Sequence, residues 1–458
     1  MAVNAGKNKY QMDMCKGPLM KQIVIFAVPY VFTGLLQIFF NAADLMVVGR
    51  FASHQALAAV GSTGSLSMLM INIMLGLAVG TNVMVARYLG AKNRKQVSRS
   101  VHTAIATAIA GGIVIGITGL IFAPVFLRWM DTPDDVIGMS TTYMRIYFSG
   151  MPAVMLYNFG GSILRAAGDT RRPLYFLVIG GIINVLLNLF FVIVCKMDVA
   201  GVAIATIMSY FFSSIMILQA MRNMTDGCRL NWKKVRFSWP NLKEIMRIGI
   251  PAGFQGSCFS IANILIQSSL NSFGSMAIAG NTAACQWEGF LFTTSAALGH
   301  TMVSFVSQNL GGEQYKRIRQ SIRYGIIFTV TVNITISAVL FIFHKPLLAL
   351  FNADPGVIQY GFIRFALCLP LQWACALMEI ETGALRGLGY SVSPMVIMIF
   401  GVCIYRIVWI ETVFRYFHSL NVLIASFPIS WVLVSVAGGL LLQKVLHKYP
   451  KNNVIKKV

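Results

Sequence analysis

The sequence predicts an all-α polytopic membrane protein with 12 transmembrane helices in two pseudo-symmetric six-helix lobes. Of its 458 residues, 57% are hydrophobic and only 11% are charged, and the mean hydropathy is +0.70. Soluble globular proteins have a larger fraction of charged residues and a smaller fraction of apolar residues. The apolar residues form runs that reach the roughly 20 residues a helix needs to cross a bilayer. The two halves of the chain also repeat the same landmarks.

The repeat has a spacing of about 221 residues. LRAAGDTRRP at 164–173 returns as LRGLGYSVSP at 385–394, and RYLGAKNRKQVSRSV at 87–101 returns as QNLGGEQYKRIRQSI at 308–322. Nearly the same spacing relates two pairs of prolines, Pro124 with Pro346 and Pro133 with Pro355. Several landmarks in one order at one spacing indicate an internal duplication.

Each half contains six apolar runs of spanning length. The predicted spans are 22–48, 55–82, 99–127, 137–163, 173–195, 199–221, 246–272, 277–304, 320–344, 357–384, 393–416 and 421–445. We therefore expect an N-terminal lobe at 1–221, a polar cytoplasmic linker at 222–245, and a C-terminal lobe with a cytoplasmic tail at 246–458.

Lys and Arg mark alternate loops. The two tails and the loops on one side of the predicted spans, together with the adjoining span ends, hold 29 of the 37 Lys and Arg residues. Because cytoplasmic loops are enriched in these residues, both termini are expected to be cytoplasmic in a multi-pass protein of the cell (inner or plasma) membrane. Six spans per repeat give both halves the same orientation, and such repeats usually meet around a substrate path.

The composition also excludes several classes of function. The net charge of +22 does not form a basic stripe, so we expect no nucleic-acid partner. The eight cysteines are scattered and make no CxxC pair. No Ser-His-Asp set, metal-ligand cluster or phosphate-binding glycine loop is recognisable, so we expect neither an enzyme nor a cofactor. The polar start of the chain indicates no cleavable signal peptide. We expect a monomer in the lipid bilayer.

Asp44, in QIFFNAADLMVVG, is the first ionisable residue within a predicted span. No Lys or Arg lies within five residues of it, so its helix offers no local partner. Such a group normally faces a cavity or a partner, and a proton or Na⁺ can neutralise it. Asp44 is therefore the candidate ion-coupling residue, with Asn41 on the same helical face. The alternative is a solvent-facing or hydrogen-bonded acid near the helix end.

Two amides in the fifth span extend this candidate site. Asn184 and Asn188 lie four residues apart on one face, and their oxygens can coordinate Na⁺ or accept a hydrogen bond from a protonated carboxyl group. It is equally consistent with the sequence that these amides join two helices. Pro29, and Pro251 in the second half, are candidate hinges because proline bends a helix.

The second half carries different buried charges. Glu288 beside Trp287 is a candidate ligand for an organic cation, and Glu379 and Glu381 are further candidate substrate-binding acids. Arg406 lies in the middle of a span, where an unpaired arginine is very costly. We expect it to form a structural ion pair with Glu379 or Glu381; the alternative is a direct role with substrate or ion.

Five segments then carry a resemblance to a known family. They are NAADLMVVGRFASHQALAAVG (41–61), VARYLGA (85–91), LRAAGDTRRP (164–173), SQNLGG (307–312) and GALRGLG (383–389). Together they resemble the multidrug and toxic compound extrusion (MATE) family of cation-coupled antiporters, across roughly residues 17–446. The resemblance implies two lobes around a central V-shaped cleft. It also implies export of small organic cations or amphipathic compounds, such as drugs and toxins, in exchange for H⁺ or Na⁺ by alternating access.

The same resemblance gives roles to individual residues. In many relatives the first-span Asp is the coupling carboxylate, which corresponds to Asp44. Relatives commonly have a second Asp where Asn188 stands, and some have a seventh-span Glu, whereas residues 249–263 contain no acid. These departures leave the choice between H⁺ and Na⁺ open. They also leave Glu379 or Glu381 as the candidate acid of the second lobe.

The alternative function is a flippase for a lipid or lipid-linked sugar. A flippase needs cations in its cleft to hold a pyrophosphate, whereas nearly all Lys and Arg here lie in predicted cytoplasmic loops. A receptor or structural protein would need a domain through which to signal, and no such domain is apparent. The sequence therefore favours the antiporter.

Overall fold

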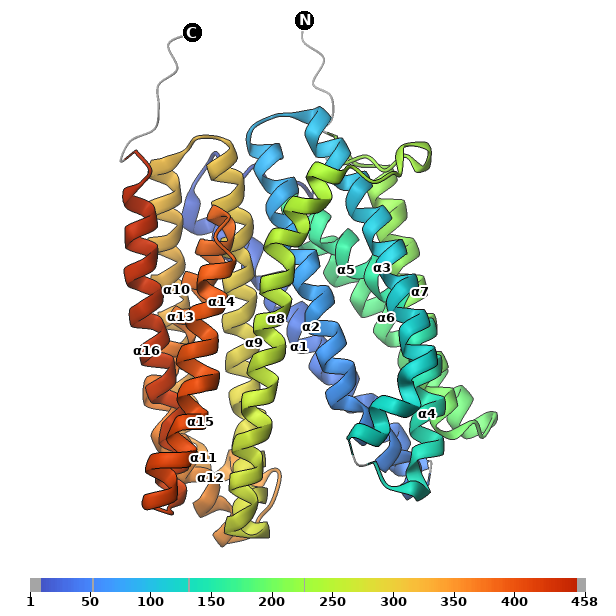
Figure 1. Ribbon diagram of the computed structural model, residues 1–458, viewed down its shortest axis with the longest axis vertical. Coiled ribbons are helices and arrows are strands. Elements are labelled where there is room, and N and C mark those ends of the chain that lie inside the picture. The colour runs from blue at the N-terminus through green and yellow to red at the C-terminus, as the bar shows by residue number, and fades with distance from the viewer. Residues whose placement is uncertain (1–9, 52, 131, 226, 451–458) are drawn as a thin grey trace, which may run out of the picture. The chain divides into compact units, whose positions relative to one another are not determined.

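The computed structural model describes residues 10–51, 53–130, 132–225 and 227–450 (Figure 1). Every regular element within these ranges is a helix, and 11 helical stretches are long and apolar enough to cross a membrane. This confirms the all-α polytopic fold class that the sequence predicts.

The chain divides into two compact units. The first unit comprises Met1–Asp13 and Val28–Ile250, and the second comprises Met14–Ala27 and Pro251–Val458. Two helices therefore contribute to both units: α1 (Leu19–Phe51) and α8 (Trp239–Leu270). The division falls two residues before Pro29 in α1 and directly before Pro251 in α8. Because proline removes a backbone hydrogen bond from a helix, both helices change unit at a natural point of bending.

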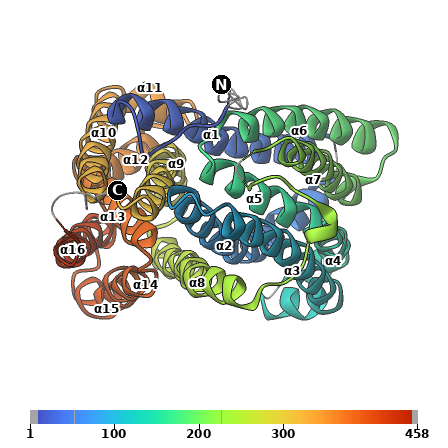
Figure 2. The same cartoon turned by 90° about the horizontal axis from the view of Figure 1, so that it is seen from above.

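The first unit contains the following elements between α1 and α8: α2 (His54–Gly90), α3 (Arg94–Trp129), α4 (Asp134–Ser149), α5 (Met151–Ala166), α6 (Arg171–Leu189), the π-helical turn η1 (Phe190–Val194), α7 (Asp198–Arg222) and the 3₁₀ turn η2 (Trp232–Lys234). Seen from above in Figure 2, α6 lies beside α7 and α3 lies beside α5.

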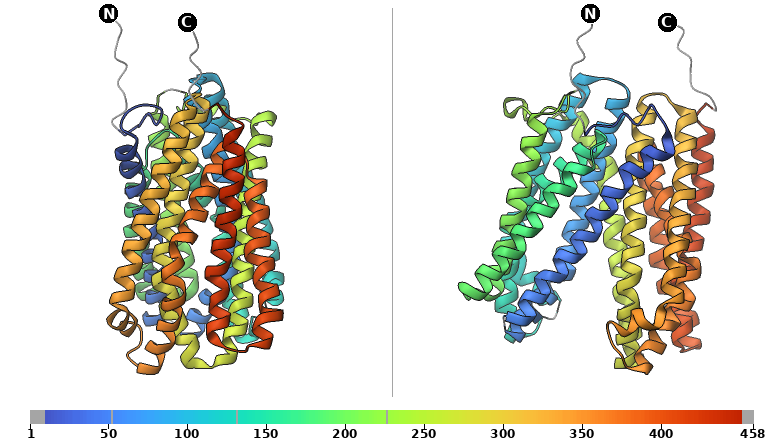
Figure 3. Two further views of the ribbon diagram at one scale, coloured as in Figure 1. Left: turned by 90° about the vertical axis from the view of Figure 1, so that its left-hand side faces the viewer. Right: turned by 180° about the vertical axis from the view of Figure 1, so that it is seen from behind.

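The second unit continues after α8 with η3 (Asn271–Phe273), α9 (Ser275–Gly311), α10 (Tyr315–Ile342), α11 (His344–Ala349), α12 (Pro355–Cys368), η4 (Leu369–Leu371), α13 (Gln372–Leu388), α14 (Val392–Met398), η5 (Ile399–Ile404), α15 (Tyr405–Trp409), η6 (Ile410–Phe414) and α16 (Leu420–His447). In Figure 3 the long helices of this unit, coloured yellow to red, run side by side, and α13 contacts both α9 and α16.

The predicted fourth span, 137–163, is two helices of 16 residues, α4 and α5, rather than one. Gly150 separates them, and Pro152 follows in the first turn of α5. A Cβ on Gly150 would lie 2.4 Å from the Ile207 side chain, so only glycine permits this approach to α7. The tenth span is similarly interrupted at η4, which contains Pro370.

Small residues bring the helices of each unit close together. A Cβ on Gly383 of α13 would lie 2.1 Å from the carbonyl oxygen of Gly299 on α9. Lipid chains are as apolar as these side chains, so the hydrophobic effect does not drive helices together in a membrane. Close van der Waals contact associates them instead. The outward side chains are apolar and exposed, as Val114 and Leu440 show. Such a surface suits contact with lipid chains.

Candidate functional site

Asp44 belongs to a polar cluster in the first unit, built by α1, α6 and α7. The side-chain amide of Asn188 donates to Oδ1 of Asp44 at 2.5 Å and to Oδ1 of Asn184 at 3.3 Å. The Thr206 hydroxyl lies beside Asp44, donates to the Val202 carbonyl at 2.9 Å and accepts from the Asn184 amide at 3.4 Å. Asn184 and Asn188 are buried, whereas Asp44 is half-buried. Together these four residues form the Asp44 cluster.

The Asp44 cluster contains an unfilled acceptor. Asn188 is fully buried, and its Oδ1 has no hydrogen-bond partner among the described residues. Buried polar atoms are normally hydrogen-bonded, so an exception needs an explanation. A protonated Asp44 can donate to an amide oxygen, and Na⁺ can be coordinated by one; either would fill this acceptor.

Three tyrosines lie near Asp44. Tyr143 and Tyr147 of α4 and Tyr210 of α7 are close enough to interact electrostatically with its carboxylate. The rings of Tyr143 and Tyr147 stack with centroids 6.2 Å apart. Sequence analysis did not identify these tyrosines, although their spacing of four residues puts both on one helical face.

Asn41 is placed differently from the other predicted coupling residues. It is exposed, and no hydrogen bond from its side chain is found within the described part of the chain. The structure thus brings Asp44, Asn184 and Asn188 together and leaves Asn41 outside their hydrogen-bond network.

In the second unit, Glu288 of α9 is already neutralised. Arg364 of α12 donates from Nε to Oε1 at 3.0 Å and from Nη2 to Oε2 at 2.7 Å, and its Nη1 donates to Oδ1 of Asn281 at 2.9 Å. Arg364 and Glu288 are both buried. The bidentate pair argues against Glu288 as a ligand for an organic cation, since a guanidinium matches a carboxylate in both geometry and charge. The neighbouring Trp287 donates from its indole N–H to the Leu347 carbonyl at 3.1 Å.

Arg406 does not make the ion pair expected with Glu379 or Glu381 among the described residues. It donates to Oγ of Ser430 from Nε at 3.2 Å and from Nη2 at 3.1 Å, and from Nη1 to Oδ1 of Asn263 at 3.2 Å. The Phe427 ring lies 4.2 Å from its guanidinium carbon. Neutral acceptors and aromatic faces therefore hold this fully buried cation, and they replace the expected carboxylate.

The two candidate acids of α13 have other surroundings. Glu379 interacts electrostatically with Arg386, about two helical turns further along α13. Glu381 is buried against Gly438 and Gly439 of α16, and its Oε2 has no hydrogen-bond partner among the described residues. The described residues contain no group of three or more His, Cys, Asp and Glu side chains that could hold a metal ion.

A duplicated set of membrane-length helices with ionisable clusters inside them defines a multi-pass membrane transporter. The chain belongs to the MatE family, whose sequence profile matches residues 29–190 and 251–410, one match in each half. It is therefore a transporter rather than an enzyme, and the resemblance to MATE proteins in the sequence is confirmed.

Individual relatives agree with this assignment. The chain is 27% identical over 398 residues to the "Probable multidrug resistance protein YoeA" of Bacillus subtilis, covering 84% of this chain and 85% of the relative. It is 23% identical to the "FAD transporter" of Shewanella oneidensis, covering 95% and 97%. A crystal structure of MATE in the bent conformation shares the fold with a TM-score of 0.87, at 21% identity over 95% of this chain and 97% of that one.

Proposed function

We propose that this protein is a secondary antiporter that exports organic cations or amphipathic compounds in exchange for H⁺ or Na⁺, with Asp44 as the coupling carboxylate. The observation that carries the proposal is the Asp44 cluster. Among the described residues, this cluster holds a carboxylate with amide and hydroxyl partners and no guanidinium, next to a buried amide oxygen without a hydrogen-bond partner. Relatives that are multidrug resistance proteins support the substrate class.

The cluster can exist in two states of different charge. With Asp44 ionised, the Asn188 N–H groups and the Thr206 hydroxyl stabilise the negative charge. When a proton arrives, the carboxyl group becomes a donor, and rotation of the Asn188 amide lets its oxygen accept that hydrogen bond. If Na⁺ arrives instead, the oxygens of Asp44, Asn188 and Thr206 are suitable hard ligands. Either ion removes the negative charge that would otherwise attract a cationic substrate.

Pro29 gives this change of charge a way to affect the helix. It lies in α1 on the N-terminal side of Asp44, and the Thr33 hydroxyl donates to the Pro29 carbonyl at 2.8 Å. A proline within a helix leaves a flexible point, so the hydrogen bonds at Asp44 can favour one bend of α1 over another. We propose that this bend couples ion binding to substrate release.

A test is transport in proteoliposomes under separately imposed pH and Na⁺ gradients, with an organic cation as substrate. The variant Asp44→Asn should lose gradient-driven efflux almost completely while keeping its fold. The matched control is Glu411→Gln, which removes an exposed acid that lies 3.9 Å from Arg415. This variant should transport like the wild type. Gradient-driven efflux by Asp44→Asn at the wild-type rate would rule out Asp44 as the coupling group. In the wild-type protein, the gradient that drives efflux identifies the coupling ion.

A second candidate substrate class is organic anions. Arg406 is a buried cation with no carboxylate partner among the described residues, and one relative is a transporter of the phosphate-bearing compound FAD. If the substrate is anionic, Arg406→Met should abolish its transport and Asp44→Asn should leave its binding intact. A flippase fits less well, because Glu288 neutralises Arg364. Arg406 is then the one buried guanidinium of the second unit without an acid partner among the described residues.

A further inference from the structure

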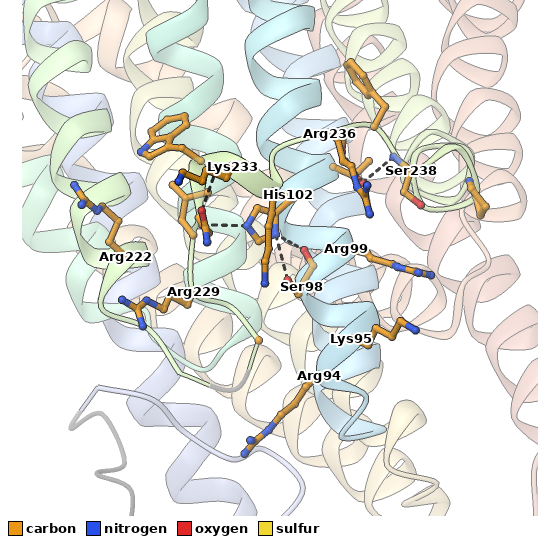
Figure 4. A pocket seen from close by; sticks show the side chains of 18 of the residues that line it. Arg94, Lys95, Ser98, Arg99, His102, Arg222, Arg229, Lys233, Arg236 and Ser238 are labelled. Carbon is orange, nitrogen blue, oxygen red and sulfur yellow. Dashed lines mark hydrogen bonds between the residues drawn. The ribbon is translucent and has the colours of Figure 1, made fainter.

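A basic pocket with a volume of about 1530 Å³ lies in the first unit, away from the Asp44 cluster (Figure 4). It forms where α3 begins, where α7 ends, and where the segment 227–240 passes over both. All of its lining residues belong to the first unit.

The charge of the basic pocket has one sign. Eight Lys and Arg side chains line it, and none of its described lining residues is acidic. Arg94, Lys95 and Arg99 come from the first turns of α3, and Arg222 comes from the last turn of α7; the other four belong to the segment after α7. Asp226, in the same connection, lies outside the described residues. Cations gathered this closely repel one another, and a multivalent anion removes that repulsion.

Hydrogen bonds hold the segment against α3, so the pocket is formed before any ligand arrives. The backbone N–H of Asn231 donates to Nε2 of His102 at 3.1 Å. Nε2 is therefore an acceptor, and Nδ1 carries the proton toward the Ser98 carbonyl at 2.6 Å. Further along, the Ser238 N–H donates to the Thr103 hydroxyl at 3.2 Å. Two successive residues of α3 thus fix the segment on both sides of η2.

The start of the segment is fixed by close backbone packing. Gly227 has φ +86°, and a Cβ there would lie 2.7 Å from the carbonyl oxygen of Arg94. Glycine is the residue that tolerates both the dihedral angle and the close approach. Because the cationic side chains project from a fixed backbone, a ligand meets a preformed site and not a flexible basic tail.

Aromatic side chains share the pocket with these cations. Trp232, Phe237 and Trp239 all line it and are exposed by 49%, 54% and 71%. Trp239 begins α8, which continues into a predicted membrane span. Tryptophan at the end of a span is typical of the headgroup level of a bilayer, and basic clusters beside a span attract anionic lipids. A soluble polyphosphate has no apolar part that could contact the exposed aromatic rings.

We propose that the basic pocket binds the headgroup of an anionic phospholipid that carries two phosphates, with its acyl chains beside the exposed aromatic residues. The shared chemistry is a multivalent phosphate, and the aromatic residues favour a lipid as its source. This site is independent of the transport cycle proposed for Asp44.

The test uses the purified full-length protein in detergent, titrated with cardiolipin and, in a separate arm, with inositol hexakisphosphate. Native mass spectrometry resolves each bound molecule. The test variant is Arg99→Gln/Lys233→Gln/Arg236→Gln, which removes three exposed cations of the pocket. The matched control is Lys243→Gln/Arg247→Gln/Arg323→Gln, which removes three exposed cations that do not line it. Thermal unfolding and gel filtration check that both variants remain folded.

We expect the test variant to bind cardiolipin roughly a hundredfold more weakly, because each lost cation removes a comparable share of the attraction. The control should lose at most about threefold, and phosphatidylcholine should not compete. Equal cardiolipin binding by all three proteins would overturn the proposal. Binding of inositol hexakisphosphate through the three cations, with cardiolipin bound equally by all proteins, would overturn the assignment to a lipid.

Discussion

The two halves of the molecule place opposite charges on corresponding helices. In the first unit, α1 and α6 bring together the carboxylate of Asp44 and the amides of Asn184 and Asn188. In the second unit, the corresponding helices bring together the guanidinium of Arg406 and the amide of Asn263. Each half of the duplicated fold thus contains a polar cluster inside its helices, and the two clusters carry charges of opposite sign.

The sequence numbering supports this correspondence. Arg406 follows Asn184 by 222 residues, and Asn263 follows Asn41 by 222 residues, which is also the spacing between Pro29 and Pro251. The difference teaches which of the two clusters can exchange an ion. A carboxylate held by amides can take up a proton or Na⁺, whereas a guanidinium keeps its charge at any physiological pH.

Glu288 completes the comparison, because it shows a carboxylate of the second unit that cannot behave as Asp44 does. Asp44 has neutral partners, while Glu288 has a bidentate arginine at 2.7 and 3.0 Å. A cation arriving at Glu288 would have to displace Arg364. The loss of a partner should therefore slow transport at Asp44, whereas at Glu288 it should lower the free energy of unfolding.

The largest effect is expected for Arg364→Met. This change leaves Glu288 buried without its counter-charge, so the free energy of unfolding should fall by about 3–5 kcal/mol. The measurement is thermal unfolding in detergent. The double variant Glu288→Gln/Arg364→Met should recover most of the loss, because it removes both charges together. If the single variant is as stable as the wild type, the pair does not hold the second unit together.

Some features of this comparison can be predicted from the sequence alone, and others cannot. Apolar run length predicts the spans, and the four-residue spacing of Asn184 and Asn188 predicts that they share a face. Glu288 and Arg364 are 76 residues apart in the sequence and lie on different helices. No local pattern identifies which helices will be in contact. Arg406 was expected to need an acid, but the hydroxyl of Ser430 and the ring of Phe427 serve instead. The break at Gly150 also depends on a neighbouring helix and is invisible in hydropathy.

The next largest effect is expected for Asn188→Leu in the first unit. A hydrogen bond to a charged group contributes about 1.5–3 kcal/mol, so losing the 2.5 Å bond to Asp44 should slow ion-driven transport by roughly tenfold to a hundredfold. The measurement is initial efflux rate in proteoliposomes. Asn41→Leu is the matched control, and it should leave the rate unchanged since Asn41 is exposed. Equal losses in both variants would contradict the placement of the coupling network on α6.

A smaller effect is expected for Thr206→Val, which removes the hydroxyl and keeps the shape of the side chain. That hydroxyl has a single proton, which the Val202 carbonyl at 2.9 Å and Asp44 both accept. Its contribution to Asp44 is therefore partial, about 0.5–1.5 kcal/mol, and transport should slow by roughly two- to tenfold. A loss as large as that of Asn188→Leu would show that Thr206 is an ion ligand in its own right.

The smallest effect on stability is expected for Arg406→Met, and it separates the two buried arginines of the second unit. Removing Arg406 leaves no carboxylate unpaired, because its partners are Ser430 and Asn263. The Ser430 hydroxyl already donates to the Phe427 carbonyl at 2.6 Å and stays satisfied. Methionine fills a similar volume, and replacing a buried charge in this way is often neutral or stabilising. The free energy of unfolding should therefore change by less than about 1 kcal/mol, against the larger loss in Arg364→Met. A loss as large in Arg406→Met would mean that an acid reaches this guanidinium after all, and the charge inversion between the two halves would no longer hold.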